Sequence, residues 1–227
     1  RNAERARIIA ELTATDWATH PGMLAQDADI YLIAVSDKAV EHVAATLPIP
    51  EGAAVAHTAG SVPLSAIPEK FARRAVFYPM QTFTKGREVD FSVIPVFLET
   101  PSAELRPELE AFARQLSGTV IWATSEQRAR VHLAAVFACN FVNHMYAVGE
   151  GIVRSAGLPF DVLKPLLAET AAKALDAASP ADVQTGPAVR NDLPTMARHR
   201  ALLAAAPRLE NIYSIISNNI WEISKKI

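Results

Sequence analysis

Five short apolar runs, each the length of a β-strand, occupy the first half of the chain, and none follows them. The runs are DIYLIAV (29–35), AVAHTA (54–59), AVFYPM (75–80), IPVFLET (94–100) and TVIWAT (119–124). Such near-continuous hydrophobicity is typical of strands that are buried on both faces of a parallel sheet. Helical patterns lie between the runs, so this half of the chain predicts an open, doubly wound α/β sheet.

After Glu126 only helical patterns remain. We predict helices over 126–150, over 158–178, after Asn191 or Asp192, and in the tail that carries Ile212, Ile216, Ile220 and Ile223. The chain is therefore predicted to contain two domains, an α/β domain over residues 1–125 and an all-helical domain over 126–227. The helical half offers more apolar faces than about 100 residues can bury, which predicts a homodimer formed through this half.

Composition narrows the classes of partner. The net charge is -2 with mixed signs, which indicates neither nucleic acid nor an anionic membrane surface as a partner.

Cys139 is the single cysteine, which excludes an internal disulfide and fits a cytoplasmic location. The longest apolar stretch (132–148) is interrupted by Asn140, Asn143 and His144, so it predicts a buried helix rather than a membrane span. The six histidines show no metal-binding spacing.

The chain begins with a helical pattern and not with a strand. A parallel sheet that begins this way lacks its first strand, so we expect a β-α-β unit of roughly 30 residues with a glycine-rich turn before Arg1 in the complete protein. That turn would bind pyrophosphate at a helix N-terminus. Arg1 would then follow the second strand and bind the 2′-phosphate of NADP, the alternative being a solvated terminal arginine.

Small and polar residues follow the first two apolar runs. The carboxyl ends of parallel strands meet at one edge of a sheet, and ligands bind there. The candidate cofactor contacts at these ends are Val35, Ser36, Thr58, Gly60 and Ser61. The alternative is that these residues form turns and caps, and Asp37 is predicted to cap a helix over 38–46.

Two further side chains at the strand ends are candidates for contact with a substrate. His57 closes the second run and could donate a proton to a substrate oxygen or nitrogen. Gln81 follows the third run and is the candidate polar substrate contact there, whereas its neighbours Met80 and Phe83 are better explained by core packing.

Asn140, Asn143 and His144 share one face of an otherwise apolar helix, because they lie at positions i, i+3 and i+4. Burying them without partners would cost about 1–3 kcal/mol each, so they either satisfy one another or face a cleft. We take His144 as the first candidate proton donor and Asn140 as a residue that orients the substrate or the nicotinamide. Asn143 is a candidate substrate contact, and interhelical hydrogen bonds are the alternative for all three.

The loop QTGPAVRND (184–192) lies between two predicted helices. Thr185 and Arg190 are candidates for binding a substrate carboxylate, for which a guanidinium is well shaped. The alternative is an ordinary loop that ends in a helix cap, and for Asp192 we prefer the cap.

Several motifs together resemble one family. They are DADIYLIAVSD (27–37), HTAGS (57–61), YPMQTF (78–83), AVFACNFVNHMY (135–146), LPFDVLKPLLAETAAKAL (158–175), QTGPAVRND (184–192) and RH (198–199). In this order they resemble the Rossmann-like oxidoreductases with a helical C-terminal domain of unknown function, which are relatives of pyrroline-5-carboxylate reductase and, more distantly, of the β-hydroxyacid dehydrogenases. The resemblance implies NADP as cofactor and a homodimer formed by the helical domain.

The chain departs from this pattern in two ways. It contains no glycine-rich fingerprint, and it has no lysine between Glu126 and Glu150, where the dehydrogenases carry an acid/base lysine. The first functional hypothesis is therefore an NADP(H)-dependent reductase acting on a C=N or C=O bond of a small molecule, without a lysine acid. The second is a non-catalytic dinucleotide-binding dimer with a regulatory or scaffolding role.

Overall fold

The computed structural model describes residues 3–225, so Arg1, with its predicted role at the 2′-phosphate, lies outside the described residues. The chain separates into two compact units, Arg1–Met145 and Tyr146–Ile227. Secondary structure changes from α/β to all-α at Ser125, where the predicted domain boundary stands. By packing, the first unit extends about twenty residues further, because the start of the long helix lies on the sheet.

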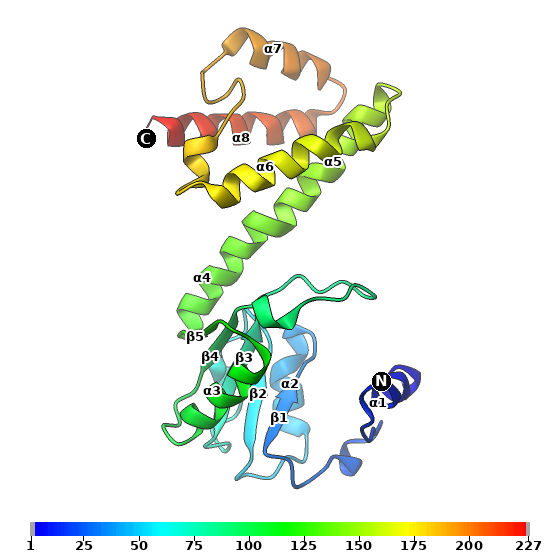
Figure 1. The fold of residues 1–227 in the computed structure, drawn as a ribbon, viewed down its shortest axis with the longest axis vertical. Helices are drawn as coiled ribbons and strands as arrows, with labels where there is room; N and C mark the ends of the chain where they lie inside the picture. Colours follow the sequence, from blue (N-terminus) through cyan, green and yellow to red (C-terminus); the bar gives the residue numbers. More distant parts are fainter. Residues whose placement is uncertain (1–2, 226–227) are drawn as a thin grey trace. The chain divides into compact units, whose positions relative to one another are not determined.

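A five-stranded sheet forms the centre of the first unit (Figure 1). Its strands are β1 (Ile30–Ile33), β2 (Ala54–His57), β3 (Arg74–Pro79), β4 (Val96–Glu99) and β5 (Val120–Trp122), and they neighbour one another in chain order. Four of the predicted apolar runs contain a strand, and β3 begins one residue before the run 75–80, at Arg74. The predicted α/β class, followed by a helical region, is confirmed.

One strand pair differs from the predicted all-parallel arrangement. β4 runs antiparallel to β3, whereas β1–β2, β2–β3 and β4–β5 are parallel pairs. The connection over 80–95 explains the reversal, because it contains only the 3₁₀ turn η4 (Phe91–Val93) and no crossover helix. A parallel neighbour requires such a crossover, whereas an antiparallel neighbour can be reached by a loop.

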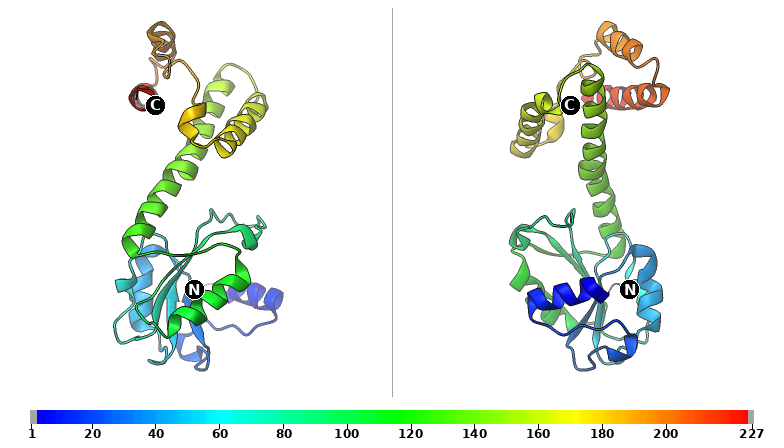
Figure 2. Two further views of the ribbon diagram at one scale, coloured as in Figure 1. Left: turned by 60° about the vertical axis from the view of Figure 1, so that its left-hand side comes forward. Right: turned by 90° about the vertical axis from the view of Figure 1, so that its right-hand side faces the viewer.

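Helices cover both faces of the sheet (Figure 2). On one face, Leu105, Leu109 and Ala113 of α3 (Leu105–Leu116) pack against the small and aromatic side chains of the central strands. On the other face lies α2 (Val40–Thr46), preceded by η2 (Asp37–Ala39), and Ala44 packs there in a second cluster. The sheet is therefore doubly covered, as its apolar strands require.

A long helical run begins on the second face. It consists of α4 (Ser125–Ala135), the π-helical segment η5 (Val136–Phe141) and α5 (Val142–Ser155). Val131 packs against Val76, Tyr78 and Phe97 of the sheet. The residues predicted to form a buried helix over 132–148 are exposed or half-buried in the single chain, so that expectation is wrong for one chain alone.

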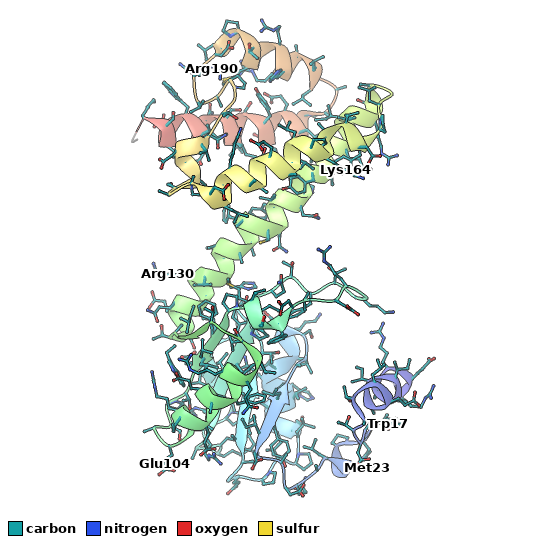
Figure 3. All side chains as sticks on the ribbon, viewed as in Figure 1. Trp17, Met23, Glu104, Arg130, Lys164 and Arg190 are labelled. Carbon is teal, nitrogen blue, oxygen red and sulfur yellow. The ribbon has the colours of Figure 1, made fainter. Side chains whose placement is uncertain are left out.

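The remaining helices form the second unit. They are η6 (Phe160–Leu163), α6 (Lys164–Asp176), η7 (Pro180–Val183), α7 (Leu193–Leu202) and α8 (Pro207–Ser224). Lys164, labelled in Figure 3, opens α6 and pairs with Asp161 at 2.5 Å. Few side chains of this unit are buried, and Leu175 and Leu202 remain more than 80% exposed. This unit has little apolar core of its own.

The N-terminal segment carries exposed apolar side chains as well. It consists of α1 (Ala3–Thr13), η1 (Pro21–Met23) and the residues that connect them to each other and to β1. A separate 3₁₀ turn, η3 (Leu64–Ala66), connects β2 to β3. Trp17 and Met23, labelled in Figure 3, are both exposed. The apolar side chains of α1 are also exposed: Ile8, Ile9 and Leu12 are 43%, 61% and 81% accessible.

Candidate active site

The loops after β1 and β2 are joined by a hydrogen bond. The Ser61 hydroxyl, after β2, donates to the Asp37 carboxylate, after β1, at 2.5 Å. The predicted helix cap at Asp37 is therefore wrong: Ser36 occupies the cap position, and the Asp37 side chain points to the neighbouring loop. Val35 and Ser36 are exposed and Thr58 is half-buried at the same carboxyl edge of the parallel strands.

The loop after β2 also touches β3 and α4 through Gly60. A β-carbon placed on Gly60 would lie 2.6 Å from His132 Nδ1 and 2.9 Å from Tyr78 Oη, distances that real β-carbons do not show. Only glycine permits this approach. The ends of β1, β2 and β3 therefore come together with one side of α4.

Arg128 of α4 holds this loop in place. Its guanidinium is fully buried and donates to the carbonyl oxygens of Ala59, Gly60 and Val62 at 2.7–3.1 Å. It also donates to Glu99 of β4 at 2.9 Å. Both Nη atoms are hydrogen-bonded, whereas the buried Nε has no partner. Removal of this buried cation is expected to cost a great deal, because it leaves its partners unpaired in the interior.

His57 lies underneath the loop and not on its open side. The side chain is fully buried, and Nδ1 accepts a hydrogen bond from the Ala59 backbone at 3.2 Å. Burial, and next the Arg128 charge, lower the pKa of His57 to about 4, so the ring is neutral at physiological pH. This placement argues against the predicted role of His57 as a proton donor and gives it a structural role instead.

A pocket of about 350 Å³ opens between the end of β3 and the helical run. Its polar lining consists of Tyr78, Gln81, Thr82, His132, Cys139 and Asn140. Met80, Phe83, Ala135 and Val136 supply the apolar lining. The structure thus brings Gln81, a predicted substrate contact, and Asn140, predicted to orient the substrate or the nicotinamide, to one pocket. The Gln81 side-chain oxygen also accepts a hydrogen bond from the Thr82 backbone.

The π-helical segment keeps the polar residues of the helical run on the side of this pocket. In an α-helix with 3.6 residues per turn, positions eight apart drift out of alignment. A π turn contains more residues than an α turn, which corrects this drift and brings His132, Val136 and Asn140 onto the same side of the helical run. All three line the pocket. Such segments are rare and occur often at functional sites.

Asn143 and His144 lie one turn further along α5. Both are exposed, and neither lines the pocket of the first unit. Because these side chains are exposed in the single chain, they do not carry the free-energy cost of burial from which a cleft was predicted. Their predicted roles stay predictions.

Thr185 and Arg190 belong to the second unit and are both exposed (Arg190 is labelled in Figure 3). Asp192 is the N-cap of α7, as preferred from the sequence, and its carboxylate accepts from the Thr195 backbone. Hydrogen bonds from Thr195 lower the pKa of Asp192, with smaller effects of the nearby arginines. The loop therefore ends in the N-cap of α7 and carries the exposed guanidinium of Arg190.

Arg128 and Tyr78 carry no signal in the sequence that marks them as part of a site. An arginine in the first turns of a helix is usually solvated, so nothing in the spacing distinguished Arg128 from Arg130. Tyr78 lies within an apolar strand, where core packing is the ordinary explanation. Within residues 3–225, no group of three histidine, cysteine or acidic side chains is placed to bind a metal ion.

Comparison with known proteins identifies a family model and similar solved structures for this chain. Residues 94–220 match the sequence model described as "Domain of unknown function (DUF2520)". A candidate NADP oxidoreductase from Bacteroides fragilis is similar at 40% identity with a TM-score of 0.88, and the match covers 98% of this chain and 86% of that protein. No curated protein matches the sequence.

Two more distant structures share the fold. A protein from Thermotoga maritima is 23% identical with a TM-score of 0.78, over 100% of this chain and 89% of that one. A pyrroline-5-carboxylate reductase from Coxiella burnetii is 15% identical with a TM-score of 0.51, over 100% and 86%. The match over more than half the chain and the 40% identity establish that this protein belongs to the DUF2520 family, whose helical domain here follows a Rossmann-like sheet.

Proposed function

We propose that the protein is an NADP(H)-dependent oxidoreductase that reduces a C=N or C=O bond of a small molecule. One observation carries the proposal: the pocket of Tyr78, Gln81, His132 and Asn140 lies where the loops after the parallel strands meet. Open α/β sheets bind their ligands beyond the carboxyl ends of the strands. The similarity to the Bacteroides protein, named for NADP, supports the cofactor.

The described residues fit one part of this cofactor. Val35, Ser36 and Ser61 on the joined loops are exposed, whereas the space beside Gly60 is already filled by Tyr78 and His132. The proposed contacts are Val35, Ser36, Thr58, Gly60 and Ser61. Val35 and Ser36 would approach the ribose and phosphates of the cofactor, and the loop over 58–61 would approach its nicotinamide. A role for Arg1 at the 2′-phosphate remains a prediction.

NADPH, when bound, supplies the hydride. The side chains of this chain hold the substrate and exclude water. Gln81 and Asn140 each offer an amide to a carbonyl or imine, and Met80 and Phe83 provide apolar surface. Thr185 and Arg190 remain proposed carboxylate ligands, as does Asn143 as a substrate contact, and His144 remains a second proposed proton donor.

We further propose a cytoplasmic homodimer. The helical run Ser125–Ser155 is long and apolar enough to cross a membrane by length and composition alone, a weak indication. Its charged and amide side chains favour burial against protein instead. Leu133 and Phe137 of this run, and Ile215 of α8, are each more than half exposed, and a second copy of the chain would cover them.

The test separates an enzyme from a non-catalytic binding protein. Binding of NADPH and NADH to the complete protein is measured by calorimetry, and reduced-nicotinamide absorbance is then followed with 1-pyrroline-5-carboxylate, 1-pyrroline and an aldehyde. We expect tighter binding of NADPH and substrate-dependent oxidation. Binding without turnover across a wide substrate panel would favour the regulatory or scaffolding alternative, and absence of binding would refute both.

A further inference from the structure

Two titratable side chains meet at the pocket and have no role in the hydride transfer itself. Tyr78 Oη and His132 Nδ1 lie 3.4 Å apart, and the two rings are in an edge-to-face arrangement with centroids 6.2 Å apart. Both side chains line the pocket and both press on the backbone of Gly60. Catalytic hydrogen bonds are often this long without a ligand and shorten when one binds.

The surroundings keep Tyr78 in its protonated form. Its side chain is 8% exposed and packs beside Phe97. Burial raises the pKa of Tyr78, and the Arg128 and Asp37 charges act in opposite directions with smaller effect. Besides these two charges, His132 of α4 is the titratable neighbour in contact with the hydroxyl. At neutral pH the phenol is therefore an intact donor that faces a pocket.

The other candidate donors are less well placed. His57 is buried beneath the loop, and its Nδ1 is engaged by Ala59. His144 is exposed and lies outside the pocket. A matching Tyr–His pair exists in the second unit, His199 and Tyr213 at 3.0 Å, but neither residue lines the pocket between η7 and the end of α8. The Tyr78–His132 pair differs because its two side chains contact each other, Tyr78 is buried, and both residues line the pocket at the end of β3.

We propose that the Tyr78 hydroxyl is the proton donor to the reduced bond and that His132 returns the proton to Tyr78, an inference that rests on the proposed function. The substrate carbon receives a hydride, for which reduced nicotinamide is the two-electron donor. The π electron pair moves to the nitrogen or oxygen, and that atom takes the proton of Tyr78 Oη. His132 reprotonates the phenolate and then takes a proton from water.

Kinetics of the complete protein test the role of the donor. Tyr78→Phe should lower kcat about 100-fold or more, the usual contribution of a general acid, with NADPH affinity changed less than about threefold. His132→Gln should lower kcat less and make it depend on added buffer acids. Tyr31→Phe, at a tyrosine equally buried in β1, and Tyr213→Phe, in the second pair, should retain wild-type kcat. A Tyr78→Phe variant that keeps more than half of the wild-type kcat overturns the proposal.

A measurement without turnover makes the result independent of the proposed function. Tyrosinate absorbance is titrated in the ligand-free protein, and Tyr78→Phe should remove a component that ionises above the range of free tyrosine. The His132 ring resonance should shift in Tyr78→Phe and stay unchanged in Tyr213→Phe. If these signals appear but the wild type never oxidises NADPH, the proposed function fails while the Tyr78–His132 pair stands. If they do not appear, the proton relay is refuted.

Discussion

The guanidinium of Arg128 and the carboxylate of Glu99 form an ion pair at 2.9 Å that joins α4 to β4 inside the first unit. Arg128 is completely buried and Glu99 is mostly so. The Ser125 hydroxyl, at the start of α4, also donates to Glu99. Because Arg128 binds three carbonyl groups of the 59–62 segment as well, one buried cation determines where the loop beside the pocket lies.

Removal of this cation should destabilise the whole unit. We expect Arg128→Met to lower the free energy of unfolding by about 3–5 kcal/mol, because three buried carbonyls lose their donor and Glu99 loses its cationic partner. Urea denaturation measures the change. Arg130→Met is the matched control, since its pair with Glu126 is nearly 80% exposed on both sides and should contribute less than about 1 kcal/mol. Equal effects of the two substitutions would contradict a stabilising role for the buried contacts of Arg128.

Gly60 should tolerate no side chain. Gly60→Ala places a methyl group less than 3 Å from both Tyr78 and His132, so we expect a loss of about 1–3 kcal/mol and a displaced pocket wall. Thermal unfolding and tyrosine absorbance report the two effects. Gly52→Ala is the control, because no neighbouring atom lies within 4 Å of the place where its methyl group would stand. A Gly60→Ala variant as stable as Gly52→Ala would refute the close packing.

His57 should make stability depend on pH. The pKa of a histidine is about 6.5 in the unfolded chain, and burial lowers it to about 4 in the folded protein. The unfolded state therefore binds more protons between these values, and the free energy of unfolding falls as pH drops from about 6.5 to about 4, by up to about 3 kcal/mol. Denaturation curves across this range measure the slope.

An asparagine at position 57 can still accept from Ala59 but does not titrate. His57→Asn should therefore flatten the slope, whereas His42→Asn, at an exposed site of α2, should leave it unchanged. A slope that persists in His57→Asn would assign the pH dependence to other groups.

The proposed dimer predicts a specific response at the long helix. Phe137 and Phe141 form an exposed edge-to-face pair with centroids 4.9 Å apart, and Phe137 is 62% accessible. Phe137→Glu should convert a dimer into monomers in light scattering, because a carboxylate would be buried at the interface. Val93→Glu, at a comparably exposed site in the β3–β4 connection, should leave the mass unchanged. A wild-type protein that is monomeric at micromolar concentration would rule out the interface.

Local patterns in the sequence were sufficient to predict the strands and most helices. The five apolar runs were predicted to form strands because near-continuous hydrophobicity favours burial, and each coincides with a strand. Burial on both faces holds for the central strands but not at the sheet edges, where Leu32 of β1 and Ile121 of β5 are 43% and 38% exposed. The Asp192 cap was predictable for a similar reason: its hydrogen bond spans only three residues. The reversal of β4 was not predicted, because it depends on a connection without a crossover helix.

The site depended on contacts between distant parts of the chain, which only the tertiary structure determined. Gln81 and Asn140 were chosen from local patterns and do share a pocket, but His57 was also chosen and is buried. Whether a polar side chain at a strand end faces a ligand or a buried cation depends on residues some seventy positions away, as between Arg128 and Ala59. The π-helical segment that aligns His132 with Asn140 has no simple periodic signature, because it is a local departure from the period by which helices are predicted.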